Sequence, residues 1–248
     1  MLHRRRMASF VTVGLPAAGL ALAAAGIGWG ATPLRDGLAG AVPAPGPGTA
    51  AAPGVAARQD PLLAQRTKGD AAAPITVYEV TDFACPWCRY FWQHALPAID
   101  SEYIQTGKVR FIFVNLPIPQ LHPNAAAAHE FAMCAARQNA FWPIHDLLYG
   151  HQEEWAGLEE PRVYFNALAD SAGLDHGSLD ECVDTGALRW LVEQEVQAVT
   201  ERAGITGTPS FIIENIVLNG FFPIEEWRPI LDSVYVAKTT GGRRPEGR

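Results

Sequence analysis

Cys85 and Cys88 stand two residues apart in the stretch VTDFACPWCRYFW. If a helix opens here, the first sulfur lies at its N-terminus, where unpaired N–H groups and the helix dipole favour negative charge. We therefore expect the Cys85 sulfur to be unusually acidic and open to solvent. Cys88, one helical turn further on, is placed to resolve a mixed disulfide. Pro86 suits the first helical turn because no N–H is needed there.

A metal site and a pair of inert core thiols are the two other interpretations of these cysteines. A closed zinc site needs four ligands. His94 is spaced to lie on a different face of the helix from Cys88, so Cys134 and Cys182 would have to complete the site. They offer neither a second C-x-x-C nor an H-x-x-x-H spacing. The pattern favours redox chemistry, and no residue is predicted as a metal ligand.

The elements that must position the pair can be inferred from periodicity. PITVYEVTDF predicts a strand that places Glu79 on the same face as Thr81. Helical spacing from Cys88 to about Thr106 follows, and KVRFIFVNLP predicts a second strand.

A block of helices is predicted next, from about His122 to Ala203. Its helical candidates are NAAAAHEFAMCAARQ, FWPIHDLLYGHQEEW, EPRVYFNALADSAG and ALRWLVEQEVQAVTERAG. TPSFIIEN and IVLNGFF predict a pair of short strands, and PIEEWRPILDSVYVA predicts a closing helix. Pro229 predicts a kink or a late start in that helix. This order of elements predicts an α/β fold.

The first thirty residues have the pattern of a membrane or export segment. LHRRR is basic, and the uncharged run that follows would be about 37 Å long as a helix, enough to cross a hydrocarbon layer of about 30 Å. Small residues at Ala21–Ala25 also suit signal cleavage. We expect residues 1–31 to be a membrane anchor or a signal peptide, and the Pro/Ala/Gly-rich residues 32–59 to be a linker.

The basic start should stay on the cytoplasmic side, so the rest of the chain is expected outside, where disulfides persist. The folded domain is predicted at 60–238, with a helical insertion at about 120–203 and a disordered tail at 239–248. The formal net charge of −7 and the lack of an extended basic block away from the termini exclude nucleic acid as the main partner.

FACPWC, followed far downstream by GITGTPSF, resembles the thioredoxin superfamily. The helical block between them resembles the DsbA-type thiol oxidoreductases of the bacterial cell envelope, and NAFWPIHDLLY is typical of one branch. The resemblance covers about Asp60 to Val236. It implies a thioredoxin fold with an inserted helical subdomain. It also implies protein thiol–disulfide oxidoreductase activity without a bound cofactor, since the disulfide itself carries the two electrons.

The resemblance assigns further residues to the site. Thr208 and Pro209 match the cis-proline dipeptide that faces the cysteines and offers a backbone edge to a bound peptide. On the sequence alone, a plain turn before a strand is the alternative. Glu79 matches a buried acid, with a raised pKa, that relays a proton to or from Cys88. An edge glutamate that faces solvent is the alternative.

Trp87 stands where the best-known oxidant of the family has a histidine, which implies a less oxidising pair. Its indole is expected to contact unfolded substrate or a membrane partner, or else to cap the local core. Some family members carry a structural disulfide at the positions of Cys134 and Cys182. Such a bridge would stabilise the fold by about 4 kcal/mol, and two separate buried thiols are the alternative.

These features predict an extracytoplasmic thiol:disulfide oxidoreductase that introduces disulfides into exported cysteine-containing proteins. A membrane thiol oxidase or reductase is the expected redox partner. An envelope reductase or isomerase stays open, because the direction depends on the reduction potential. A non-enzymatic metal carrier or holdase that uses Trp87 and the insertion is the alternative from another class.

Overall fold

The computed structural model describes residues 60–240. The expected anchor or signal (1–31) and the linker (32–59) lie outside these residues. Within 60–240, no helix is both long enough and apolar enough to cross a bilayer.

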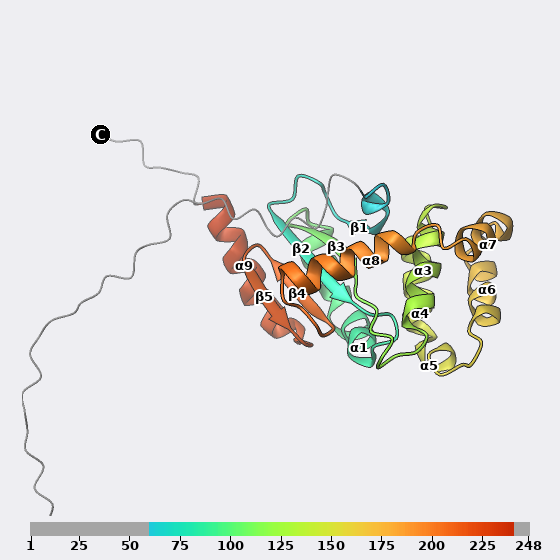
Figure 1. Ribbon diagram of the computed structural model, residues 1–248. Helices are drawn as coiled ribbons and strands as arrows, with labels where there is room; N and C mark the ends of the chain where they lie inside the picture. Colours follow the sequence, from blue (N-terminus) through green and yellow to red (C-terminus); the bar gives the residue numbers. More distant parts are fainter. Residues whose placement is uncertain (1–59, 241–248) are drawn as a thin grey trace, which may run out of the picture. The chain divides into compact units, whose positions relative to one another are not determined.

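A mixed five-stranded sheet in the order β1-β3-β2-β4-β5 lies at the centre of the described chain (Figure 1). The strands are β1 (Thr67–Lys68), β2 (Ile75–Thr81), β3 (Val109–Asn115), β4 (Ser210–Ile213) and β5 (Ile216–Asn219). β2 and β3 run parallel, whereas β1 is antiparallel to β3, β4 to β2, and β5 to β4. The central strands β2 and β3 are buried along most of their length because helices cover both of their faces.

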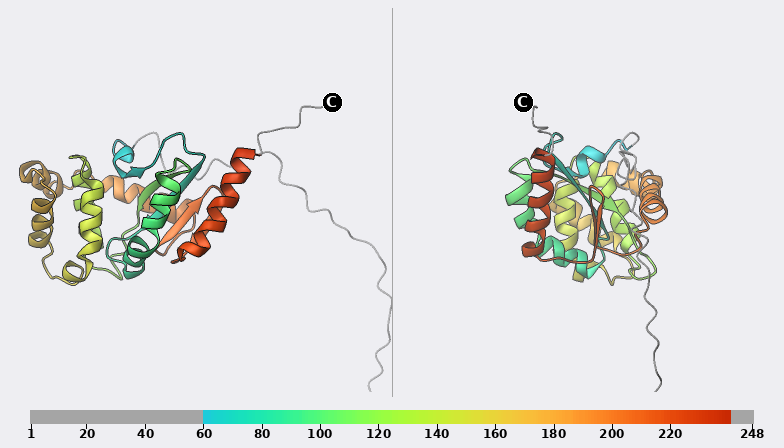
Figure 2. Two further views of the ribbon diagram at one scale, coloured as in Figure 1. Left: turned by 180° about the vertical axis from the view of Figure 1, so that it is seen from behind. Right: turned by 90° about the vertical axis from the view of Figure 1, so that its left-hand side faces the viewer.

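Two helical layers sandwich the sheet (Figure 2). The helices of one layer are α1 (Pro86–His94), α2 (Leu96–Ile99), η2 (Asp100–Ile104) and α9 (Ile224–Thr240). Here Phe91 and Trp227 pack with Phe211 of the sheet. The segments of the other layer are η1 (Leu63–Arg66), α8 (Arg189–Gln197) and η3 (Ala198–Arg202). Val199 packs there with Ile112.

The inserted helices form a subdomain with an apolar core of its own, which continues to the cysteine pair. They are α3 (Ala125–Ala136), α4 (Phe141–Gly150), α5 (Gln152–Trp155), α6 (Arg162–Ser171) and α7 (His176–Asp184). The predicted thioredoxin fold with a helical insertion is therefore confirmed.

Two helical expectations need correction. The helix expected from Cys88 to about Thr106 begins at Pro86 and is interrupted after His94, so that three short segments replace one helix. Pro97 explains the interruption, because it has no N–H and its ring crowds the carbonyl four residues earlier. Helix α7 was not among the helices expected in the insertion. Its signal was the N-cap Asp175, whose side chain accepts a hydrogen bond from the N–H of Ser178.

Of the kink or late start predicted for the last helix, the late start is wrong. Helix α9 begins at Ile224 and continues through Pro229. A proline in the second turn removes one hydrogen bond near the end of the helix, where the loss is tolerated more easily. The helix ends at Thr240, so the boundary expected after Lys238 is two residues too early.

Candidate active site

The cysteine pair and the Thr208–Pro209 dipeptide meet at one edge of the sheet. Strand β2 ends at Thr81, and helix α1 opens at Pro86 with Cys85 as its N-cap. Strand β4 is antiparallel to β2 and starts opposite its end, so the residues just before β4 lie at the same edge. The Thr208–Pro209 peptide bond is cis, and Cys85 Sγ lies 3.5 Å from the carbonyl oxygen of Thr208.

Cys85 has a stabilised thiolate although its side chain is not open to solvent. A hydrogen bond from the Cys88 thiol, together with the Thr208 side chain and the N–H groups of Cys88 and Trp87, lowers the pKa of Cys85 to about 6 against the opposing effect of burial. The residue is only 5% exposed, so the expected open sulfur is wrong. The neighbouring residues that supply these hydrogen bonds also cover the Cys85 sulfur.

The pKa of Cys88 is shifted in the opposite direction from that of Cys85. It is fully buried, and burial raises the pKa of its thiol well above the ordinary value. The neighbouring Cys85 raises it further, because a second negative charge beside a thiolate is unfavourable. Ionisation of the reduced pair is therefore concentrated on Cys85.

Glu79 lies on β2, the middle strand of the sheet. It pairs with Phe113 of β3 and Phe211 of β4, and it is fully buried, which excludes the solvent-facing alternative. Burial raises the pKa of Glu79 to about 8, with Thr81 acting in the opposite direction. Neither carboxyl oxygen has a hydrogen-bond partner within residues 60–240. The group is therefore mainly protonated near neutral pH.

The turn that carries Cys85 is fixed by a buried carboxylate that we did not predict, Asp82. One of its oxygens accepts the N–H of Ala84 at 2.8 Å, and the other accepts the N–H of Ile118 at 3.0 Å and pairs with His122 Nδ1 at 2.8 Å. An aspartate just after a strand gives only the weak signal of a turn former. Its partners Ile118 and His122 are 36 and 40 positions away in the sequence.

The insertion holds the same turn from two further sides. His129 on α3 accepts the N–H of Phe83 at 3.2 Å, and its other ring nitrogen lies 2.7 Å from Asn115 Oδ1. Gln152 donates to the carbonyl oxygens of Phe83 at 2.6 Å and Cys85 at 3.0 Å. His129 is thus a hydrogen-bonded core residue. Within the described chain, no group of three or more His, Cys, Asp or Glu side chains could hold a metal ion.

Trp87 projects beside the pair and is 60% exposed, which does not fit a cap on the local core. Its ring lies 5.8 Å from that of Tyr90 and 6.4 Å from that of Phe221, centroid to centroid. Tyr90 is itself 43% exposed. We call these three residues the aromatic patch.

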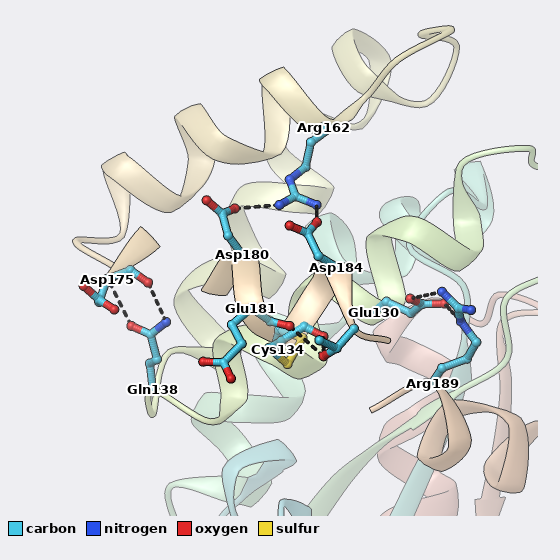
Figure 3. Close-up of a disulfide and its surroundings, with 11 residues drawn as sticks. Glu130, Cys134, Gln138, Arg162, Asp175, Asp180, Glu181, Asp184 and Arg189 are labelled. Atoms are coloured by element: carbon cyan, nitrogen blue, oxygen red, sulfur yellow. Dashed lines mark hydrogen bonds and ion pairs between the residues drawn. A yellow bond between two sulfur atoms is a disulfide. The ribbon is translucent and has the colours of Figure 1, made fainter. Parts of the chain in front are cut away.

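The second cysteine pair lies inside the insertion. Cys134 of α3 and Cys182 of α7 form a disulfide. Figure 3 shows the polar contacts around it, among them Arg162, which reaches Asp180 and Asp184. These contacts and the bridge hold α6, α7 and α3 together.

Comparison with known proteins agrees with the fold. A family model described as thioredoxin matches residues 63–233. The fold and the cysteine pair define the class, that of the DsbA-like thiol–disulfide oxidoreductases with a thioredoxin fold. The chain belongs to the thioredoxin family.

Several known proteins are similar to this chain in sequence or in fold. The chain is 32% identical over 73% of its length to a protein named Na(+)/H(+) antiporter NhaA 3 from Salinispora tropica, but it spans only 27% of that protein. It is 24% identical to Disulfide bond formation protein D of Bacillus subtilis, covering 70% of this chain and 78% of that one. The structure of Wolbachia pipientis alpha-DsbA1 matches with a TM-score of 0.65 at 19% identity, covering 72% of this chain and 94% of that one.

Proposed function

We propose that this protein introduces disulfides into exported proteins outside the cytoplasmic membrane, through the Cys85–Cys88 pair. The observation that carries the proposal is a Cys85 sulfur at the opening of α1, next to the cis Thr208–Pro209 bond, with its pKa lowered to about 6. A stable thiolate favours the reduced form of the pair, which makes the disulfide form a better oxidant. This supports the oxidising direction over the reductase or isomerase.

In the first step, a substrate thiolate attacks Cys85 Sγ of the Cys85–Cys88 disulfide. The S–S bond breaks, Cys88 leaves with the electron pair, and Cys85 forms a mixed disulfide with the substrate. Because burial disfavours a charge on Cys88, its thiolate must be neutralised. Glu79 carries a proton near neutral pH and is the proposed donor to Cys88.

In the second step, another substrate thiolate attacks the substrate sulfur of the mixed disulfide. Cys85 leaves as a stabilised thiolate, the substrate gains a disulfide, and the two electrons remain on the reduced Cys85–Cys88 pair. A membrane thiol oxidase would then accept these electrons. No bound cofactor is needed, because the cysteine pair carries the electrons between the two partners.

Substrate binding is assigned to the edge beside the dipeptide. A cavity of about 430 Å³ there is lined by Gly207, Thr208, Pro209, Ser210, Asn219 and Gly220, among others. An extended peptide pairing with this backbone would hold its cysteine against Cys85. The aromatic patch offers apolar contact to the flanking residues of an unfolded chain, which is the role proposed for Trp87.

Trapping tests the function directly. Cys88→Ser leaves Cys85 to form mixed disulfides that cannot be resolved from within the protein, so covalent complexes with exported proteins should accumulate. Cys85→Ser is the matched control and should trap none. Equal trapping by both variants, or none by Cys88→Ser, would refute the proposal. Equilibration of the pair with glutathione then separates an oxidase from a reductase, since only a strongly oxidising potential fits the former.

A further inference from the structure

Two buried hydroxyl groups meet beneath the Cys85–Cys88 pair. Thr81 is the last residue of β2, Tyr149 lies near the end of α4, and both are fully buried. Their hydroxyl oxygens are 2.8 Å apart, in a hydrogen bond that either group can donate. The two residues are 68 positions apart, so this bond ties the insertion to the strand that leads into the site.

The hydroxyl pair lies under the face of α1 that carries Cys88. Trp92 stands one turn after Cys88 on α1, and its ring stacks on that of Tyr149 with centroids 5.9 Å apart. Phe83, in the turn before α1, contacts the same ring at 5.1 Å. Thr81 acts on the Cys88 thiol as a hydrogen-bond partner that lowers its pKa, against the larger effect of burial.

Tyr149 stays protonated throughout the reaction. Burial raises its pKa well above the ordinary value, and the charges of Cys88 and Glu79 raise it further. Its O–H group can therefore donate a hydrogen bond in every state of the site. A permanent donor that touches Thr81 can set the direction in which the Thr81 hydroxyl points.

We infer that Tyr149 is a positioning residue for Cys88, an inference that rests on the proposed function. When a substrate thiolate attacks Cys85, the S–S bond breaks and Cys88 takes the electron pair. Tyr149 donates its O–H to Thr81 Oγ1, which turns the Thr81 O–H toward the Cys88 sulfur. This donor stabilises the thiolate until Glu79 delivers its proton. Cys88 is then a neutral thiol, and both hydroxyl groups have kept their protons.

The test is the rate at which dithiothreitol reduces the Cys85–Cys88 disulfide of the full chain, measured across a range of pH. Tyr149→Phe keeps the ring and removes only the hydroxyl. We expect the rate near neutral pH to fall about tenfold, less than the roughly hundredfold loss for a donor that touches the reacting atom. The loss should grow above the pKa of Glu79, about 8, where that carboxyl no longer supplies a proton.

Tyr103→Phe is the matched control. Tyr103 is another buried tyrosine, 3% exposed, and its hydroxyl donates to Asp232 at 3.1 Å on the α9 side of the fold. We expect its reduction rate and pH profile to match those of the wild type. Thr81→Val should lose as much rate as Tyr149→Phe, Thr81→Ser should rescue most of that loss, and the double variant should be no slower than either single one.

A wild-type rate and pH profile in Tyr149→Phe would overturn the inference. An equal loss of rate in Tyr103→Phe would overturn it as well, because the effect would then come from general destabilisation. If Tyr149→Phe does not fold, Thr81→Val carries the same test, and a wild-type rate there overturns the inference. A wild-type disulfide that fails to exchange at all refutes the proposed function instead, and this appears before any variant is compared.

Discussion

The two cysteine pairs are almost equally buried, yet they differ in the groups around them and in the length of chain that they span. Cys85 and Cys88 are 5% and 0% exposed, and Cys134 and Cys182 are 2% and 1% exposed. The first pair lies at the start of one helix. There the Cys88 thiol, the Thr208 side chain and backbone N–H groups lower the pKa of Cys85. The second joins two helices of the insertion across 48 positions of the chain.

This difference shows that burial alone does not decide what a cysteine pair does. Hydrogen bonds to a thiolate stabilise the reduced form, so a disulfide between Cys85 and Cys88 is easily reduced. A bridge between Cys134 and Cys182 instead closes a long loop, which restricts the unfolded chain and stabilises the fold. We therefore expect the first pair to govern activity and the second to govern stability.

The largest expected effect separates the two pairs by activity. Cys85→Ser should lower the oxidation rate of a reduced dithiol peptide more than about a thousandfold, because the sulfur that the substrate thiolate attacks is gone. Its unfolding free energy should change by less than about 1 kcal/mol, since serine is a favoured N-cap residue. The rate is measured by peptide oxidation and the stability by denaturant unfolding. A Cys85→Ser protein that keeps its activity would contradict the assignment.

The converse change removes the second pair. Cys134→Ala with Cys182→Ala should lower the unfolding free energy by about 4 kcal/mol, as the chain-entropy model gives for a loop of 48 residues. Peptide oxidation by the folded fraction should stay close to the wild-type rate. Unfolding in urea measures the loss, and the wild type in reducing agent is the control. An unchanged midpoint would mean that the bridge restricts little of the unfolded chain.

A third comparison replaces one aspartate near each cysteine pair, Asp82 before Cys85 and Asp175 at the start of the helix that carries Cys182. Asp82→Ala should cost about 2 kcal/mol, because the buried N–H groups of Ala84 and Ile118 lose their acceptor. Asp175→Ala, at the exposed N-cap of α7, should cost about 1 kcal/mol. Only Asp82→Ala should also shift the reduction potential of the pair, which equilibration with glutathione measures. Equal effects of both changes on the potential would contradict a specific role of Asp82.

Local signals in the sequence were enough to predict the core of the site. A strand, C-x-x-C and a helix follow each other within one short stretch, and Pro86 marks the helix start. The position of Thr208–Pro209 required the family resemblance, because nothing nearby shows that this segment returns to the edge of β2. The resemblance also led to Glu79, which the alternation of the strand alone left open.

The supporting residues could not be predicted, because their partners are distant in the chain. Arg66 is fully buried and bonds Glu195 across 129 positions, and Asp82 meets His122 across 40. Charged side chains with these spacings ordinarily indicate a solvated surface. Only the packed fold shows that Arg66 and Asp82 are buried beside these partners, and that Asp82 fixes the turn before Cys85.

The last expected effect is a pH dependence that one pair has and the other lacks. The pKa of Cys85 is about 6 in the reduced fold, against 9.0 as its ordinary value. Between these values the unfolded chain holds more protons, so the stability of the reduced form should rise with pH. The slope should reach about 1.4 kcal/mol per pH unit relative to the oxidised form, which lacks this thiol. The gain is lost as pH falls through 6.

Denaturant unfolding of the reduced and oxidised forms measures this difference in stability. In Cys85→Ser, compared with the oxidised wild type, the rise in stability with pH should vanish. A flat difference between the reduced and oxidised wild type would show that Cys85 is an ordinary thiol, and the contrast between the two pairs would then rest on loop length alone.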